Sequence, residues 1–282
     1  MTRVVCERIT EGEAYFPLLA FSPDGSLLAT AAECCAIGLW NGLTGAHAMT
    51  LEYRCETRSL AFLPDSTHLI SGSDGGSILL WNVVIGGLVR TVNAHGDWVV
   101  SLSASSTKPL VASASEDGTV RVWDTQSWKC LDVLNCNSDL RSVSFYPDGE
   151  KLVFGSRDGC VAVWDATTSQ QIKSFQMQSD VTDVAVSSDG KWLAVTCYHD
   201  PGTISVFDTT TFGTPVWTEC VKCARSVSVS PDGLQLVSSS DDPENEIRMW
   251  GMASGKYIKS YKHKFVMPAL FSPDGSHIVS GK

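Results

Sequence analysis

The sequence predicts one all-β domain built from repeated antiparallel sheets, and three observations lead to this fold class. Extended runs such as Val99 to Ala104 alternate side chains with a period of two, whereas a helix needs a period near 3.6. A strand-ending aromatic residue recurs every 41 to 43 residues. A Pro-Asp-Gly type turn recurs with the same period. Two landmarks that share one period indicate structural repeats along essentially the whole chain.

Composition and charge narrow the class of protein further. The chain has 282 residues, of which 43% are hydrophobic and 18% charged, and this balance is typical of a folded domain with a sizeable core. A formal net charge of -10 argues against general nucleic-acid binding, because phosphate neutralisation needs clustered Lys and Arg. No run has the length of a membrane span, and the charged N-terminus does not resemble a signal peptide. We expect a protein of the cytoplasm, or of the nucleus, that does not bind membranes.

The ten cysteines fit the same intracellular setting. They occupy unequal positions in the repeats, and Cys160 and Cys197 lie inside predicted strands, so reduced thiols are favoured over disulfides. Cys220 and Cys223 have the spacing of half a zinc site, but no second pair lies at a matching distance. We therefore expect no bound metal and no cofactor.

The two landmarks can be followed along the chain. The aromatic landmark stands at Trp40-Asn41, Trp81-Asn82, Trp123-Asp124, Trp164-Asp165, Phe207-Asp208 and Trp250-Gly251. The turn landmark stands at Pro23-Asp24-Gly25, Pro64-Asp65-Ser66, Pro147-Asp148-Gly149, Ser188-Asp189-Gly190, Pro231-Asp232-Gly233 and Pro273-Asp274-Gly275. The third repeat has Ser106-Thr107-Lys108-Pro109 in place of this turn.

This period and these signatures resemble the WD40-repeat family over essentially the whole chain. The resemblance implies a β-propeller whose repeats each supply four antiparallel strands around a central channel. We expect seven blades in a single domain spanning 1–282, six of them complete and the closing one incomplete. The repeat units are approximately 14–53, 59–93, 98–135, 140–176, 181–221 and 225–261, with a partial unit at 265–282.

The third unit is the most complete, and its strands are predicted at Trp98 to Ser105, Leu110 to Ser115, Thr119 to Trp123 and Cys130 to Leu134. Family resemblance implies that its His95, Ser113, Asp117 and Trp123 form a buried hydrogen-bond chain. An indole only donates, a carboxylate only accepts, and imidazole and hydroxyl groups do both, so every member can be satisfied. The other units lack one or more members of this set. We expect those blades to rely on apolar packing.

The end of the chain raises a question of closure. The partial unit stops where its third strand should begin, and residues 3–9 are a candidate outer strand for it. Without a third strand, that outer strand is expected to have no neighbour, and an open edge favours aggregation. Either the chain is a fragment, or the ring closes irregularly; it is expected to be a monomer unless another chain completes the blade.

Aligning the units brings three arginines to one face of the ring. Arg58, Arg141 and Arg225 precede the Ser-Leu or Ser-Val pair of the inner strand in the second, fourth and sixth units. One hypothesis is that they bind an acidic or phosphorylated peptide near the channel. The simpler alternative, which the sequence favours, is that they pair with acidic neighbours on the same rim, namely Glu56, Asp74, Glu116, Asp139, Asp180 and Asp241.

Aromatic and apolar residues map to the same rim. Trp98 is a candidate contact residue for a partner, and Tyr15, Phe265 and Met267 occupy related positions in the first and seventh units. The alternative is that Trp98 packs against its own loop.

No catalytic residue is predicted. The inner-strand positions are Val, Ser, Ala, Leu and Arg, rather than converging His, Asp or Glu, and the Gly-Lys near the C-terminus is not a phosphate loop. The leading hypothesis is a non-catalytic scaffold that binds partner proteins or peptides on a propeller face, by analogy with the fold. The alternatives are a substrate receptor of a ubiquitin ligase, which the missing Arg after Trp123-Asp124 disfavours, and a sensor array of a larger signalling ATPase.

Overall fold

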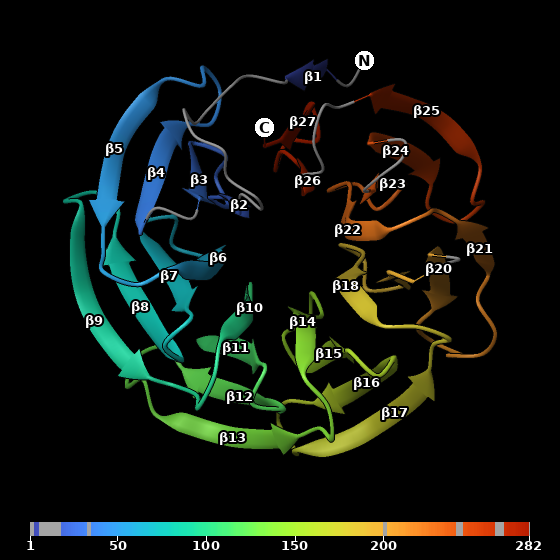
Figure 1. Ribbon diagram of the computed structural model, residues 1–282, viewed down its shortest axis with the longest axis horizontal. Coiled ribbons are helices and arrows are strands. Elements are labelled where there is room, and N and C mark those ends of the chain that lie inside the picture. Colours follow the sequence, from blue (N-terminus) through green and yellow to red (C-terminus); the bar gives the residue numbers. More distant parts are fainter. Residues whose placement is uncertain are drawn as a thin grey trace.

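Seven sheets are arranged in a ring around a central opening (Figure 1). The computed structural model describes residues 3–5, 18–32, 35–199, 202–240, 245–262 and 268–281. Among these residues no helix has the length and hydropathy needed to cross a membrane. We number the sheets as blades 1 to 7 in chain order. Within the described ranges, blades 1 to 6 have four strands and blade 7 has three. The structure therefore confirms the predicted propeller with six complete blades and a partial seventh.

The strands of blades 1 to 3 are β2 (Leu18–Phe21), β3 (Leu27–Ala32), β4 (Ala36–Asn41), β5 (His47–Glu52), β6 (Thr57–Phe62), β7 (His68–Ser73), β8 (Ser77–Asn82), β9 (Gly87–Asn93), β10 (Val99–Ala104), β11 (Leu110–Ser115), β12 (Thr119–Asp124) and β13 (Cys130–Asn135). Those of blades 4 to 6 are β14 (Leu140–Phe145), β15 (Lys151–Ser156), β16 (Cys160–Asp165), β17 (Gln170–Gln176), β18 (Val181–Val186), β19 (Trp192–Cys197), β20 (Thr203–Asp208), β21 (Trp217–Cys220), β22 (Ala224–Val229), β23 (Gln235–Ser240), β24 (Glu246–Gly251) and β25 (Tyr257–Lys262). Blade 7 contains β26 (Ala269–Phe271), β27 (His277–Ser280) and β1 (Arg3–Val5).

Burial follows the position of each strand in its blade. In blade 3 the second strand is buried along nearly its whole length, while the outer strand β13 buries only Leu134. Because both faces of a blade pack against neighbouring blades, the middle strands consist almost entirely of apolar or small residues. The core is accordingly divided into clusters between neighbouring blades, such as the one that joins Val99 and Trp123 to Ile78 of blade 2.

The inner strands of blades 2 to 6 share an irregularity near their start. In β6 the pairing with β7 runs from Thr57 opposite Ser73 directly to Ser59 opposite Gly72, so Arg58 is an extra, unpaired residue. The same register shift occurs in β10, β14, β18 and β22. A β-bulge bends its strand and re-aims the extra side chain. This bulge decides which side chains reach the mouth of the channel.

The ring closes through β1, in a way that corrects our expectation for the closing strand. We expected an outer strand without a neighbour, but β1 pairs directly with β27 in parallel, with Val4 opposite Ile278. In a complete blade the outer strand runs parallel to the second strand and is separated from it by the third strand. β1 has the same parallel direction, but it pairs directly with the second strand of blade 7, β27. Figure 1 shows β1 and β27 together between β5 and β25. Residues 6–9 of the predicted closing strand lie outside the described residues.

Two faces of the ring are distinguished below by their loops. The rim face carries the connections into the inner strands and the turns between second and third strands. The turn face carries the turns between first and second strands and those between third and fourth strands.

Candidate functional site

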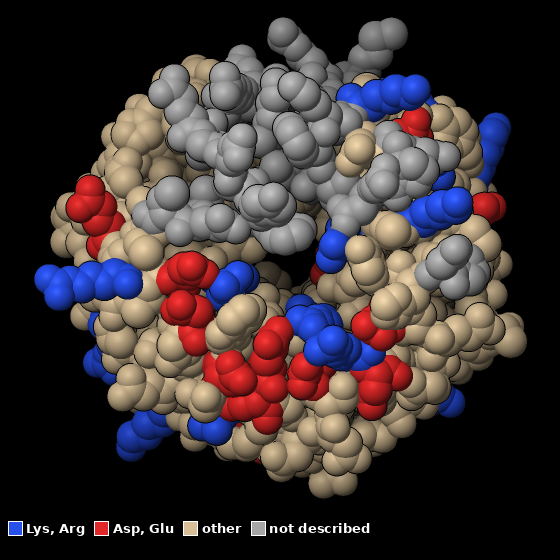
Figure 2. Space-filling view, viewed as in Figure 1, with Lys and Arg blue, Asp and Glu red and all other residues tan. Residues whose placement is uncertain are grey.

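The mouth of the channel on the rim face is where the bulges place their extra residues, which are Arg58, Val100, Arg141, Thr182 and Arg225 in blades 2 to 6. Figure 2 shows this face, with basic and acidic side chains gathered beside the central opening. The sequence alignment grouped the three arginines, and the repeated bulge is the structural reason that they share one environment.

Arg58 lies between a carboxylate and an indole. Its Nη2 donates to Oε2 of Glu56 at 2.6 Å, and its guanidinium carbon lies 4.0 Å from the centroid of the Trp98 ring. A guanidinium at this distance is attracted by the negative face of the indole. The interaction holds Trp98 in place, yet the residue remains 38% exposed. Arg58 and Trp98 therefore form an ordered cationic and aromatic surface across the boundary between blades 2 and 3.

Arg141 and Arg225 are held by the turn of the preceding blade. Arg141 donates through Nη1 to Oε1 of Glu116 at 2.6 Å. Arg225 donates through Nη2 to the hydroxyl of Tyr198 at 3.2 Å, with its guanidinium carbon 4.2 Å from the centroid of the same ring. Sequence reasoning missed Tyr198, although it occupies in blade 5 the turn position that Glu116 occupies in blade 3. The alignment that found the arginines contained the signal for their partners.

The remaining predicted rim residues are not brought together here. Tyr15, Phe265 and Met267 lie outside the described residues, so Trp98 is the member of the predicted aromatic and apolar group that the structure describes. Acidic residues do share the rim: Asp139 accepts from Arg157 at 3.3 Å, and Asp180 lies 3.4 Å from His199.

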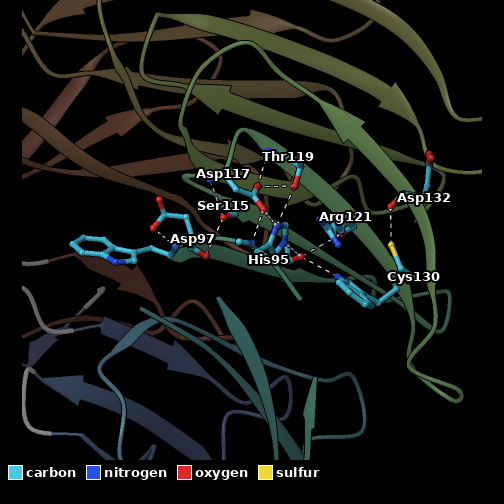
Figure 3. Close-up of polar contacts among 12 residues, drawn as sticks. His95, Asp97, Ser115, Asp117, Thr119, Arg121, Cys130 and Asp132 are labelled. Carbon is cyan, nitrogen blue, oxygen red and sulfur yellow. Dashed lines mark hydrogen bonds and ion pairs between the residues drawn. The ribbon is translucent and has the colours of Figure 1, made fainter. Parts of the chain in front are cut away.

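Blade 3 contains the hydrogen-bond chain that the resemblance implied (Figure 3). Nε1 of Trp123 donates to Oγ of Ser113 at 2.9 Å, and Oγ of Ser113 lies 2.7 Å from Nε2 of His95. Nδ1 of His95 lies 3.0 Å from Oδ2 of Asp117. These partners fix the tautomer: Nδ1 donates to the carboxylate, and Nε2 accepts from the hydroxyl. Sequence reasoning missed a fifth member, Thr119, whose hydroxyl donates to Oδ1 of Asp117 at 2.7 Å.

Burial and hydrogen bonding set the charges of this chain. Burial lowers the pKa of His95 more than the attraction of Asp117 raises it, so the imidazole is neutral at pH 7. Burial opposes ionisation of Asp117, but hydrogen bonds from Thr119 and from the N–H of Gly96, together with His95, outweigh it and lower its pKa to about 2. The chain thus contains one carboxylate and a neutral imidazole.

The same chain has the order of atoms found in a Ser-His-Asp catalytic triad, but its setting is different. Ser113 is 0% exposed, and the His95 side chain is also 0% exposed, so no substrate carbonyl can approach the hydroxyl. The Ser113 oxygen already accepts from Trp123. A nucleophile must reach its substrate. The arrangement serves as an internal connection between strands.

Other blades keep part of this chain, which corrects the expectation that they rely on apolar packing alone. The indole N–H groups of Trp40, Trp81 and Trp250 donate to hydroxyls of Thr30, Ser71 and Ser238 at 3.0, 2.9 and 3.0 Å. These hydroxyls stand ten or twelve residues before each tryptophan, which is the signal that the sequence offered. In blade 4 the corresponding residue is Phe154, and the buried Nε1 of Trp164 has no partner among the described residues.

A second set of hydrogen bonds joins consecutive blades around the channel. Ser101, Ser142 and Ser226 each accept, through Oγ, a backbone N–H of the next inner strand. In blade 5 this position is Asp183, whose Oδ2 accepts from the N–H of Val227 at 3.0 Å. Its Oδ1 also accepts from the hydroxyl of Ser142 at 2.8 Å. Burial raises the pKa of Asp183 to about 6, despite these donors.

Comparison with protein families gives two partial matches. The model described as "WD domain, G-beta repeat" matches residues 19–41, 50–82 and 86–124. A model described as "Cytochrome D1 heme domain" matches residues 108–223. The residues do not fit a haem: the one histidine in this range, His199, has a side chain that is 65% exposed and pairs with Asp180. The described residues also contain no cluster of three His, Cys, Asp or Glu side chains that suits a metal.

Comparison with known proteins supports the fold over the whole chain and sequence likeness over a short part. The solved structure of U3-55K superposes with a TM-score of 0.87 at 18% identity, covering 98% of this chain and 90% of that one. The Periodic tryptophan protein 2 homolog of Mus musculus is 40% identical over 68 residues, which are 24% of this chain and 7% of that protein. Eukaryotic translation initiation factor 3 subunit I of Aspergillus oryzae is 31% identical over 68 residues, 24% of this chain and 20% of that protein. The chain thus matches only a small part of the length of either relative.

Proposed function

Because the chain belongs to the WD40-repeat family, whose propellers are typically non-catalytic scaffolds, we propose that it binds a protein partner at the mouth of the channel on its rim face. The observation that carries this proposal is the ordered surface formed by Arg58 and Trp98. An exposed Trp held by a guanidinium loses little conformational freedom on binding, and Trp and Arg are enriched among the residues that dominate interface energies. One relative is a subunit of a translation initiation factor, which is consistent with a role in assemblies.

The chemistry of the rim favours a partner segment that carries an acidic or phosphorylated residue. Arg141 uses one nitrogen for Glu116, and its side chain remains 31% exposed. A guanidinium has five N–H donors and readily binds a second anion bidentately. The competing role for these arginines is internal pairing, since both Arg58 and Arg141 already have a glutamate at 2.6 Å.

Binding of defined peptides separates the two roles. We would measure the fluorescence anisotropy of a labelled phosphoserine peptide and of its unphosphorylated form with the wild type, with Arg58→Ala/Arg141→Ala/Arg225→Ala, and with Trp98→Ala. Arg157→Ala is the matched control, because Arg157 is a rim arginine paired with Asp139 but is not a bulge residue.

The expected result is at least about tenfold weaker binding of the phosphopeptide to the triple variant and to Trp98→Ala, with the control unchanged. Glu116→Gln should strengthen binding, because it releases Arg141 from its carboxylate. Equal affinities of the wild type and the triple variant would show that the arginines only pair internally.

A further inference from the structure

The turns between first and second strands follow one chemical pattern in every blade except blade 3. In the other six blades, an aspartate Oδ1 accepts the backbone N–H of the residue two positions later, at 2.8 to 3.1 Å. This is a side chain that completes its own turn. In blade 3 the aspartate is replaced by Thr107, and the residue two positions later is Pro109, which has no N–H to donate. The blade 3 turn therefore cannot adopt the common form.

The common turns also contact one another around the turn face. In blades 1, 5 and 7 the glycine of the turn lies against the proline of the neighbouring blade, as for Gly190 with Pro147 and Gly275 with Pro231, where a Cβ on the glycine would lie 3.7 and 3.5 Å from the ring. These glycines have a positive φ, near 70°, which suits glycine. In blade 3 the glycine position is taken by Lys108.

The blade 3 turn instead contacts blade 4. Nζ of Lys108 lies 3.6 Å from Oε1 of Glu150, and the hydroxyl of Thr107 donates to the carbonyl of Asp148 at 2.9 Å. Between blades 1 and 2 the turns still meet, because Ser66 Oγ accepts the N–H of Asp24 at 3.2 Å. Between blades 2 and 3 the ring of turn contacts is interrupted, and Pro64 and Lys108 line a pocket instead.

A pocket of about 300 Å³ lies at this interruption. One wall is the blade 2 turn, with Leu63, Pro64 and Asp65, and the other is the blade 3 turn from Ser106 to Leu110, with Thr125 nearby. Its volume is at the lower limit of ligand sites, which suits one or two side chains of a peptide rather than a cofactor. Its walls combine apolar side chains with a few polar groups, as binding pockets do.

The charge at the mouth of the pocket is negative. Burial disfavours ionisation of Asp65, but hydrogen bonds from His68 and from the N–H of Thr67 outweigh it and lower the pKa of the carboxyl group, so it is ionised at pH 7. The ammonium of Lys108 is offset by Glu150. The Asp65 side chain is 49% exposed, so its charge faces solvent beside the pocket.

Exposed apolar residues stand on the same face beside blade 2. Val84 and Ile85 are 68% and 78% exposed, in a turn that a hydrogen bond from the N–H of Val83 to the carbonyl of Thr67 joins to the blade 2 wall at 3.0 Å. The corresponding turn of blade 4 has Ala166-Thr167-Thr168-Ser169, whose members are small or polar. Val84 and Ile85 thus add exposed apolar surface to the turn face of blade 2.

From the interrupted turn, the pocket and its negative mouth, we propose that the cleft between the blade 2 and blade 3 turns is a docking site for a peptide segment that inserts a leucine side chain and places a following Lys or Arg against Asp65. The site lies on the turn face and is independent of the rim-face proposal.

Two tetrapeptides with acetylated N-termini and amidated C-termini test this proposal, Gly-Leu-Arg-Gly and its matched control Gly-Ser-Arg-Gly. Binding is followed through the methyl NMR signals of Leu63, Leu110 and Thr125, which line the pocket. We expect saturable shifts with the leucine peptide at concentrations near 1 mM, and at least about tenfold weaker binding of the serine peptide. A third peptide, Gly-Leu-Glu-Gly, should also bind more weakly, because its carboxylate meets Asp65.

Two variants locate the binding. Ser106→Pro/Thr107→Asp/Lys108→Gly/Pro109→Ser restores the common turn at the same length and should abolish the shifts by closing the pocket. Asp65→Asn keeps the turn oxygen but removes the charge, and it should reduce the preference for Arg over Glu. Arg157→Ala, on the opposite face, should bind as the wild type does. Equal shifts for the leucine and serine peptides, or undiminished binding to the restored turn in a folded variant, would overturn the proposal.

Discussion

The tryptophans of blades 3 and 4 provide a matched pair for testing what the buried indole hydrogen bond contributes to stability. The Nε1 that Trp123→Phe removes donates, in the wild type, a buried hydrogen bond to Oγ of Ser113 at 2.9 Å. In Trp164→Phe the lost Nε1 is buried without a partner among the described residues, because Phe154 stands where the hydroxyl would be. Blade 5 already has Phe207 at this position, 3% exposed, which shows that a phenyl ring fits there.

The expected difference between the two variants can be worked out from these contacts. Both substitutions remove a similar part of an indole, so their losses of apolar contact largely cancel. Removing the Trp123 hydrogen bond costs about 1 kcal/mol, whereas removing the unpartnered Trp164 N–H relieves a penalty of about 1 to 3 kcal/mol. Trp123→Phe should therefore lower the free energy of unfolding by about 2 to 4 kcal/mol more than Trp164→Phe does.

Equilibrium urea unfolding followed by far-UV circular dichroism measures this difference, because each transition midpoint is read against that variant's own folded and unfolded signals. The midpoints are comparable as long as the m-values of the variants agree with that of the wild type. An equal or larger loss for Trp164→Phe would refute the reasoning, since the partner of the N–H would then have no effect on stability.

Three further predictions concern the carboxylates. Asp117→Ala should lower the free energy of unfolding by several kcal/mol, because it leaves His95, Thr119 and the Gly96 N–H without their acceptor, and a loss below about 1 kcal/mol in urea would contradict this. The pKa of Asp117 is lowered to about 2 in the folded state, so the ionised carboxylate contributes its full stabilisation above the unfolded pKa near 3.8 and loses it as the pH falls through about 2. The difference in free energy of unfolding between the wild type and Asp117→Asn, measured in urea, should therefore narrow as the pH falls from 3.8 to 2. The pKa of Asp183 is raised to about 6 in the folded state, so the free energy of unfolding should fall by up to about 3 kcal/mol as the pH rises from 3.8 through 6. Asp183→Ser introduces the residue that blades 4 and 6 have at this position, Ser142 and Ser226, and it should remove this dependence of the urea midpoint on pH.

The fold was predictable because its strongest signals are local and repeated. The strands of blade 3 agree with the prediction to within one residue at each end. Each repeat needs only alternation, a turn and a terminal aromatic residue to define its sheet, and stacking of neighbouring repeats buries the apolar faces. The closure was not predictable in the same way, since the pairing of β1 with β27 joins the two ends of the chain and has no counterpart in another repeat.

At the rim, the sequence predicted positions better than partners. Alignment placed Arg58, Arg141 and Arg225 in equivalent sites, and the bulge explains this. It named Glu116 among several acidic neighbours without assigning it to Arg141, and it missed Tyr198, because the partners belong to neighbouring blades and differ in chemistry. The hydrogen bonds of Asp183 were missed for a related reason. Other repeats have Ser at this position, and the role of Asp183 becomes visible only when its partners in the neighbouring blades, Ser142 and Val227, are known.

Blade 3 combines the most complete hydrogen-bond chain with the most divergent turn, and the two properties fit together physically. Its His95, Ser113, Asp117 and Trp123 connect β11 and β12, the turn between these two strands and the loop before the blade, without any contribution from the turn at Ser106 to Pro109. The turn contacts that other blades share are therefore less necessary for this sheet. A local departure from the common pattern is tolerated where other interactions specify the same structure. On this argument, restoring the common turn should raise the free energy of unfolding while it closes the pocket.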